Sequence, residues 1–243
     1  MIKILSIGNS FSVDAQCYLH DISLYGGQEV YCANLYIGGC SLETHFNNLK
    51  NNSKAYEYHI NGENTEKFIS INDAVLQNEW DYITLQQVSG SSGIWDTYSP
   101  YLEAIADFIR HNSKAKLIIH QTWAYETDSS HPDFSKYDFD QNKMYTAICS
   151  CYEKAAKLIN AHMVIPSGEL IQTLRNTEAF DYAKTGCSLC RDGFHLDLLY
   201  ARYAVAALWY KKLTGESLLN NGFSPNGSKT EKINLIKETL ERF

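Results

Sequence analysis

The chain opens with the stretch that decides its fold, IKILSIGNSFS at residues 2–12. Its first part, Ile2 to Ile7, is a short apolar run that ends at Gly8, which is the pattern of a buried strand. Asn9 and Ser10 then form a polar turn ahead of a helical segment. A strand, a turn and a helix in this order are typical of α/β proteins, which bind ligands beyond the carboxyl ends of their strands.

The same alternation of apolar runs and helical segments continues along the chain. Further strands are expected at 30–37, 82–85, 116–120 and 163–165, and helices at 14–25, 42–50, 72–77, 98–111, 141–161, 167–177, 195–213 and 228–243. Residues 51–70 read as irregular or hairpin-like. Parallel strands joined by crossover helices predict one domain over 1–243, a three-layer α/β/α sandwich with a five-stranded parallel sheet, similar to flavodoxin in layout.

Composition and charge describe an ordinary globular chain. Of 243 residues, 44% are hydrophobic and 20% are charged, which suffices for a full core. The formal charge of −7 without a basic cluster argues against nucleic acid as a partner. No apolar run is long enough for a membrane span, so no membrane partner is expected. A cytoplasmic protein is expected if Met1 is the native start, with a removed export signal as the alternative. The sequence leaves the oligomeric state undetermined.

The seven cysteines are an odd number, and most are expected to be buried apolar residues or free thiols. Cys187 and Cys190 form a CxxC pair, which can hold zinc or carry out redox chemistry. A zinc site usually needs a second ligand pair, and Cys149 and Cys151 have the wrong spacing to supply one. No metal is therefore expected, and zinc at the CxxC pair remains the alternative.

Two short motifs at opposite ends of the chain carry the chemistry. A serine hydroxyl such as that of Ser10 is a weak nucleophile and needs an adjacent base. Asp192 and His195 stand three residues apart, a spacing that can place the carboxylate against Nδ1 and leave Nε2 free to accept the serine proton. The alternatives are a plain turn at Ser10, with Ser12 or Asp14 capping the helix, and a helix cap at Asp192 beside a surface histidine.

Other polar segments follow the remaining strand ends and are expected on the same rim of the sheet as Ser10. They are Gly38-Gly39, Gln86-Gln87 and the loop after His120. Trp95, Trp123 and Tyr125 stand in these loops, near acidic side chains, and are candidates for stacking on the face of a sugar. Packing that anchors the loops is the alternative.

Taken together, these segments resemble the SGNH (GDSL-like) hydrolase superfamily over residues 4–210. Gly8 to Ser12 resembles its nucleophile block, Gly38-Gly39 its glycine block, and Asp192 to His195 its closing D-x-x-H block. The Gly-Asn-Ser-Phe-Ser opening and the Leu-Gln-Gln strand end further resemble an uncharacterised bacterial subgroup common in gut Bacteroidetes. The resemblance implies the SGNH hydrolase layout and a serine hydrolase without a cofactor.

Two departures from the superfamily pattern affect the site. Asn9, a candidate substrate-binding residue, stands where an aspartate is usual, and Gln86-Gln87 follows the strand where a Gly-x-Asn-Asp block is usual. Some carbohydrate-esterase branches use a glutamine amide as an oxyanion donor. Because side chains alternate along a strand, only one of the two glutamines points at the site, and Gln87 is preferred over Gln86. A buried amide bonded to loop backbone is the alternative.

The resemblance implies acyl transfer through Ser10, with His195 as general base and then general acid, and Asp192 orienting the imidazole. The expected oxyanion donors are the backbone N–H groups of Ser10 and Gly39 (or Gly38) and the Gln87 side chain. Small acyl esters of carbohydrates, acetyl above all, are the expected substrates. The alternatives are a thioesterase or lipid esterase with the same mechanism and a non-catalytic module that binds a glycan or a protein. A flavodoxin-like nucleotide binder is disfavoured, because the chain has no glycine loop after the first strand to hold a phosphate.

Overall fold

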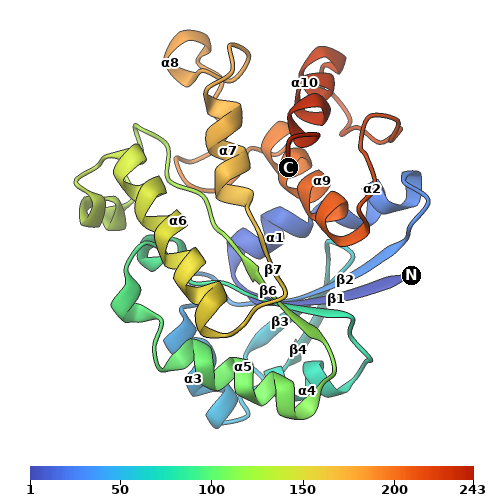
Figure 1. The fold of residues 1–243 in the computed structure, drawn as a ribbon, viewed down its shortest axis with the longest axis vertical. Helices are drawn as coiled ribbons and strands as arrows, with labels where there is room; N and C mark the ends of the chain where they lie inside the picture. Colours follow the sequence, from blue (N-terminus) through green and yellow to red (C-terminus); the bar gives the residue numbers. More distant parts are fainter.

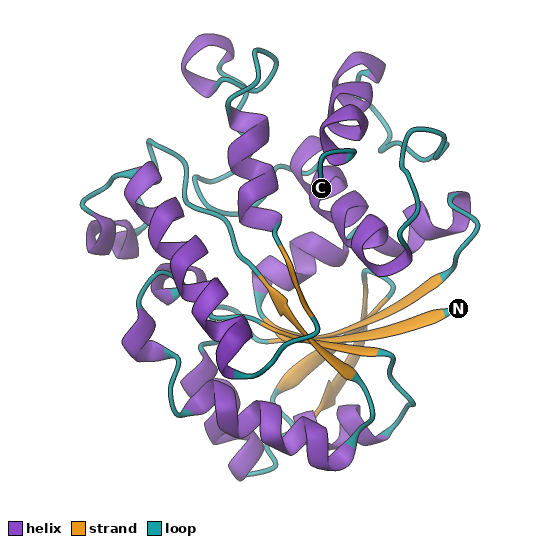
Figure 2. Cartoon of the chain, in the orientation of Figure 1, coloured by secondary structure: helices purple, strands orange, loops and turns teal.

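A seven-stranded sheet runs through the molecule with helices on both of its faces (Figure 1, Figure 2). The computed structural model describes residues 1–243. Five strands are parallel and match the predicted ones: β1 (Ile2–Gly8), β2 (Val30–Tyr36), β5 (Tyr82–Leu85), β6 (Lys116–His120) and β7 (Met163–Ile165). The strand order is β4-β3-β2-β1-β5-β6-β7, so β1 is central.

The predicted five-stranded sheet is wrong in strand number, because a hairpin adds two antiparallel strands beyond β2. These strands are β3 (Tyr56–Ile60) and β4 (Glu63–Ile69). Asn61 and Gly62 make the turn with φ values of 51° and 87°, and positive φ at both positions defines the tight hairpin turn that Asn-Gly favours. Tyr56 and Tyr58 are buried on one face of the hairpin, while Glu57 and His59 point to the other and are only partly buried.

The helices form two layers around the sheet. Figure 1 shows α1 (Ser10–Gln16), α2 (Leu19–Tyr25), α9 (Tyr200–Thr214) and α10 (Thr230–Leu240) on one face, and α3 (Leu42–Lys50), α4 (Ile71–Leu76) and α5 (Tyr101–Asn112) on the other. The helix α6 (Gln141–Leu158) contacts β6 and β7, and α7 (Ser167–Arg175) and the short α8 (Tyr182–Thr185) follow. None of these helices has the length and apolar character that a membrane crossing demands.

Several helix boundaries differ from prediction, and two of these differences shape the site. The helix expected from residue 14 begins at Ser10, because the Asn9 side chain caps it by accepting a hydrogen bond from the Phe11 N–H at 3.0 Å. The helix expected from His195 begins at Tyr200, where the Asp197 carboxylate accepts from the N–H groups of three residues at the helix start. His195 therefore lies in a turn, outside the helix.

Candidate active site

Ser10, His195 and Asp192 meet beyond the carboxyl end of β1. Ser10 Oγ lies 2.8 Å from His195 Nε2, and His195 Nδ1 lies 2.7 Å from Asp192 Oδ2. The carboxylate at Nδ1 holds the ring so that Nε2 faces the hydroxyl, which is the orientation a general base requires. The three side chains named from the sequence are thus brought together, and they are partly exposed, with 20% of the His195 side chain and 41% of the Asp192 side chain accessible.

The turn that carries Asp192 and His195 is held by its own hydrogen bonds. Asp192 Oδ1 accepts from the N–H groups of Phe194 at 3.2 Å and His195 at 2.8 Å, which leaves Oδ2 for the imidazole. Gly193 adopts a φ of 86°, and a side chain there would also meet Ser129 at 3.0 Å. Partial burial by itself raises the pKa of Asp192, but the hydrogen bonds from the His195 ring and the two N–H groups outweigh it and hold that pKa below its usual value.

A buried carboxylate, Asp14, joins the helix of Ser10 to the turn of His195. Asp14 lies on α1, one helical turn after Ser10, and only 1% of it is exposed. Its Oδ2 accepts from the Leu196 N–H at 2.9 Å, Arg191 Nη1 donates to both of its oxygens at 3.1 Å, and Arg202 Nη2 lies 2.6 Å from Oδ1. These bonds fix the position of Ser10 relative to His195. Sequence reasoning considered Asp14 only as a helix cap.

The turn after β2 offers backbone donors beside Ser10. The Ser10 N–H stands at the start of α1, where it has no acceptor within the helix. Gly39 has a φ of 63° and is exposed, and a side chain there would meet no atom within 4 Å, so this turn is open to solvent. Asn9 Nδ2 donates to the Cys40 carbonyl at 3.1 Å and so fastens the glycine turn to the nucleophile turn.

Hydrogen bonds explain why position 9 carries an amide side chain and not a carboxylate. A hydrogen-bond chain runs beneath the nucleophile turn, from His120 Nδ1 to Gln86 Oε1 at 2.6 Å and from Gln86 Nε2 to Asn9 Oδ1 at 2.8 Å, and it continues through Asn9 Nδ2 to the Cys40 carbonyl. An aspartate has no N–H to donate to that carbonyl. Burial lowers the pKa of His120 to about 3, so its ring is neutral and its Nδ1 donates to the amide oxygen.

The preferred glutamine is fully engaged away from Ser10. Gln87 Nε2 donates to the Thr97 carbonyl at 2.9 Å and the Thr97 hydroxyl at 3.0 Å, and its Oε1 accepts from the N–H groups of Leu42 and Val88. With both amide hydrogens used, Gln87 has none left for an oxyanion. The expected donor role is therefore corrected to that of a buried amide bonded to loop backbone. Gln86, the fallback, supports Asn9 in the chain described above.

Two of the three aromatic candidates for sugar stacking, Trp123 and Tyr125, are buried. Trp123 is 0% exposed, stacks on Phe11 with ring centroids 4.1 Å apart and donates from Nε1 to the Phe194 carbonyl at 2.7 Å. Tyr125 is also 0% exposed, and its hydroxyl is bonded to Ser89 at 2.9 Å. Neither ring has a face free for a substrate, so the predicted sugar-stacking role is wrong for both. They pack instead against residues next to Ser10 and His195. Trp95 is partly exposed and stacks on Tyr98.

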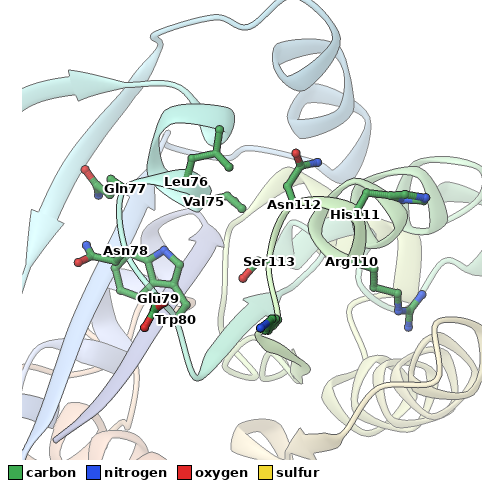
Figure 3. Close-up of a pocket in the computed structure, with 11 residues that line it drawn as sticks. Val75, Leu76, Gln77, Asn78, Glu79, Trp80, Arg110, His111, Asn112 and Ser113 are labelled. Atoms are coloured by element: carbon green, nitrogen blue, oxygen red, sulfur yellow. The ribbon is translucent and has the colours of Figure 1, made fainter.

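The two largest described cavities lie away from Ser10, Asp192 and His195. A cavity of about 750 Å³, shown in Figure 3, is formed by the segments that precede β5 and β6, at the opposite rim of the sheet from Ser10. None of the five best-defined cavities is lined by Ser10, Asp192 or His195. The candidate site therefore lies outside these five cavities.

The cysteines of the CxxC pair face different partners. Cys190 is buried and its Sγ lies 3.3 Å from Arg175 Nη2, while Cys187 Sγ lies 3.0 Å from Lys232 Nζ. All seven cysteines are free thiols. The chain contains no group of three or more histidine, cysteine and acidic side chains arranged to hold a metal ion.

The fold is that of the SGNH hydrolases, as the resemblance in the sequence predicts. A putative SGNH hydrolase from Slackia heliotrinireducens aligns over 87% of this chain and 98% of its own, with 18% identity and a TM-score of 0.57. A lipase/acylhydrolase from Enterococcus faecalis aligns over 88% and 96%, with 15% identity and a TM-score of 0.55. At these identities the likeness concerns the fold.

Within this fold, the chain belongs to the family described as "Domain of unknown function (DUF4886)", whose profile matches residues 3–241. A crystal structure of a DUF4886 family protein from Bacteroides uniformis ATCC 8492 is 39% identical, covers 99% of this chain and 93% of its own, and has a TM-score of 0.92. A search of curated proteins finds no match.

Proposed function

We propose that this protein is a serine esterase that hydrolyses small acyl esters through an acyl-enzyme on Ser10. The observation that carries the proposal is the unbroken chain from Ser10 Oγ through the His195 ring to Asp192, at 2.8 and 2.7 Å. A hydroxyl, an imidazole and a carboxylate in this order are the parts of a nucleophile, its base and the group that orients the base.

In the proposed mechanism, His195 Nε2 takes the proton of Ser10 as Oγ attacks the ester carbonyl. The imidazolium, supported by Asp192, then protonates the leaving alcohol, and a water activated by the same ring releases the acyl group from Ser10. The backbone N–H groups of Ser10 and Gly39 (or Gly38) are the donors for the oxyanion. No side-chain amide is assigned to it, because Gln87 is committed to Thr97.

The proposed substrates are acetyl or similarly small acyl esters of carbohydrates. The side chains of the site are partly exposed, with 41% of the Asp192 side chain accessible, so a large hydrophilic alcohol has room to approach. A long acyl chain is held in an apolar cleft, and the best-defined cavities do not include the site. The same geometry serves thioesters and lipid esters in principle, so chain length is the variable to measure.

The test is turnover of p-nitrophenyl acetate by the wild type, Ser10→Ala and His195→Ala. We expect each substitution to lower kcat by about 1,000-fold or more, because the nucleophile and its base act as a unit. Equal rates for the three proteins would end the proposal. A fluorophosphonate probe that fails to label Ser10 would favour a non-catalytic module, and a maximum at long chains in a C2 to C10 ester series would remove the preference for acetyl.

A further inference from the structure

A cluster of Tyr36, Glu57 and His59 lies beside the nucleophile turn and takes no part in the mechanism above. The hairpin β3–β4 brings it there, because the register pairs Gly8 with Tyr36 and Tyr36 with Glu57 across three neighbouring strands. Adjacent strands are about 4.8 Å apart, so Glu57 lies about 10 Å from Gly8, and Ser10 follows Gly8 by two residues. The cluster is thus within reach of a substrate whose ester lies on Ser10.

The three side chains contact one another on the face of the sheet that α1 covers. The rings of Tyr36 and His59 have centroids 5.5 Å apart, and His59 Nε2 lies 3.7 Å from Glu57 Oε2. Asn64 Nδ2 donates to the same Glu57 oxygen at 2.8 Å, which holds the carboxylate in place. The Tyr36 hydroxyl reaches the glycine turn, because a side chain on Gly38 would lie 3.3 Å from it.

Two buried nitrogen atoms, one in this cluster and one beneath it, have no hydrogen-bond partner. They are Asn34 Nδ2, on a residue that is 2% exposed, and His59 Nε2. Both residues line a narrow recess, too small to admit a water molecule, together with Val13, Gln16 and Gly62. Because the recess admits no ring, a sugar could contact only the residues at its mouth, Tyr36 and His59. Buried polar groups without a partner are uncommon, and one at a surface recess favours a polar ligand.

The chemistry of the cluster fits a polyhydroxylated alcohol. A phenol ring offers an apolar face, the half-exposed Glu57 carboxylate accepts hydrogen bonds from hydroxyl groups, and a neutral imidazole both accepts and donates. Burial lowers the pKa of His59, an effect that Glu57 opposes, so the ring is neutral at pH 7. The three side chains include no fixed positive charge for a phosphate and no aliphatic surface for an acyl chain.

We propose that Tyr36, Glu57 and His59 form a subsite that binds the sugar part of the substrate, outside the ester that reacts at Ser10. This inference rests on the proposed esterase function and specifies its alcohol. It predicts that the cluster governs the KM of glycoside esters and leaves the reaction of a small aryl ester unchanged, because an aryl acetate has no hydroxyl groups to bind there.

The experiment compares wild type, Tyr36→Phe, Glu57→Gln and His59→Gln on two substrates, an acetylated methyl glycoside with free hydroxyl groups and p-nitrophenyl acetate. We expect KM for the glycoside ester to rise about tenfold in Glu57→Gln, the loss of a hydrogen bond to a charged group, with kcat for p-nitrophenyl acetate within twofold of wild type. The control is Glu29→Gln, which removes an exposed carboxylate near the amino end of β2. Equal changes on both substrates, or none on either, would overturn the subsite.

Failure of the esterase proposal gives a different result. If wild type turns over neither ester, the subsite is tested by saturation-transfer NMR with the unacetylated methyl glycoside. A sugar signal that is present with wild type and Ser10→Ala, and lost with Glu57→Gln but not with Glu29→Gln, supports the subsite without catalysis. No signal with wild type refutes it.

Discussion

The turn that carries Asp192 and His195 could be predicted from sequence, whereas the side chains of the neighbouring loops could not. Asp192 and His195 are three residues apart, and the hydrogen bonds that orient them lie within their own turn. Gln87 and Trp123 stand at equally suggestive positions, yet both point into the molecule, to Thr97 and Phe11. Chemistry that is local in the chain can be predicted from spacing, whereas the direction of a loop side chain depends on partners far away in sequence.

The largest change in activity and stability is expected at Asp14, whose hydrogen bonds join the helix of Ser10 to the turn of His195. Asp14→Asn leaves Arg191 and Arg202 without their carboxylate and weakens the hold on Leu196. A displacement of about 1 Å between nucleophile and base costs about 100-fold, so we expect kcat for p-nitrophenyl acetate to fall by this order while KM changes little. Breaking a buried ion pair also costs about 3–5 kcal/mol in unfolding free energy.

Asp21→Asn, at an exposed position on α2, is the matched control and should change neither quantity. Kinetics are measured well below the midpoint of thermal unfolding of each variant, so that loss of folded protein is separated from loss of alignment. A fully folded Asp14→Asn enzyme with the wild-type kcat would show that the turns hold their positions without this link.

A smaller effect on activity is expected at Gln87, and it tests whether this side chain is a buried structural amide or an oxyanion donor. Gln87→Met keeps the approximate volume of the side chain but removes its bonds to Thr97 and to the N–H groups of Leu42 and Val88. We expect the unfolding free energy to fall by about 2–3 kcal/mol, since buried donors and acceptors lose their partners, and kcat to fall by less than about tenfold. Loss of an oxyanion donor costs about 100- to 1,000-fold in kcat, and such a result would return Gln87 to the oxyanion hole.

The smallest effect concerns the pH dependence of stability. Burial lowers the pKa of His45 and of His120 to about 3, from an ordinary value of 6.5. Between pH 6.5 and 3 the unfolded chain therefore binds protons that the folded chain does not, and the unfolding free energy falls as pH falls, by about 1.4 kcal/mol per pH unit for each histidine. Above pH 6.5 neither residue contributes to this dependence.

Urea unfolding of wild type and His120→Gln at several pH values from 5 to 7 checks this expectation. In the variant, the decrease of the unfolding free energy below pH 6 should be smaller by about 1.4 kcal/mol per pH unit. Identical slopes for wild type and His120→Gln would show that the buried ring is protonated in the folded protein, which contradicts its place as a donor to Gln86.

The hairpin β3–β4 carries a local sequence signal, although residues 51–70 were predicted only as irregular or hairpin-like. Asn61-Gly62 stands between the runs that form β3 and β4, and such a dipeptide is a strong indication of a tight hairpin. Buried residues alternate with partly buried ones only in β3, and no residue of β4 is buried. The Asp14 network had no comparable signal. Arg191 and Arg202 are 177 and 188 positions away from Asp14, and no local pattern reports an ion pair across that separation.

The amino-acid sequence alone determined the five parallel strands, their crossover helices and the residue types of the proposed nucleophile, its base and the carboxylate that orients the base. Periodicity, turn chemistry and short spacings are properties of neighbouring residues. Only the tertiary structure decided how many strands the sheet has, which amides are already bonded, which aromatic rings are buried and what holds Ser10 against His195. Those features arise when distant segments compete for the same hydrogen bonds and the same buried volume, and that competition takes place only in the folded chain.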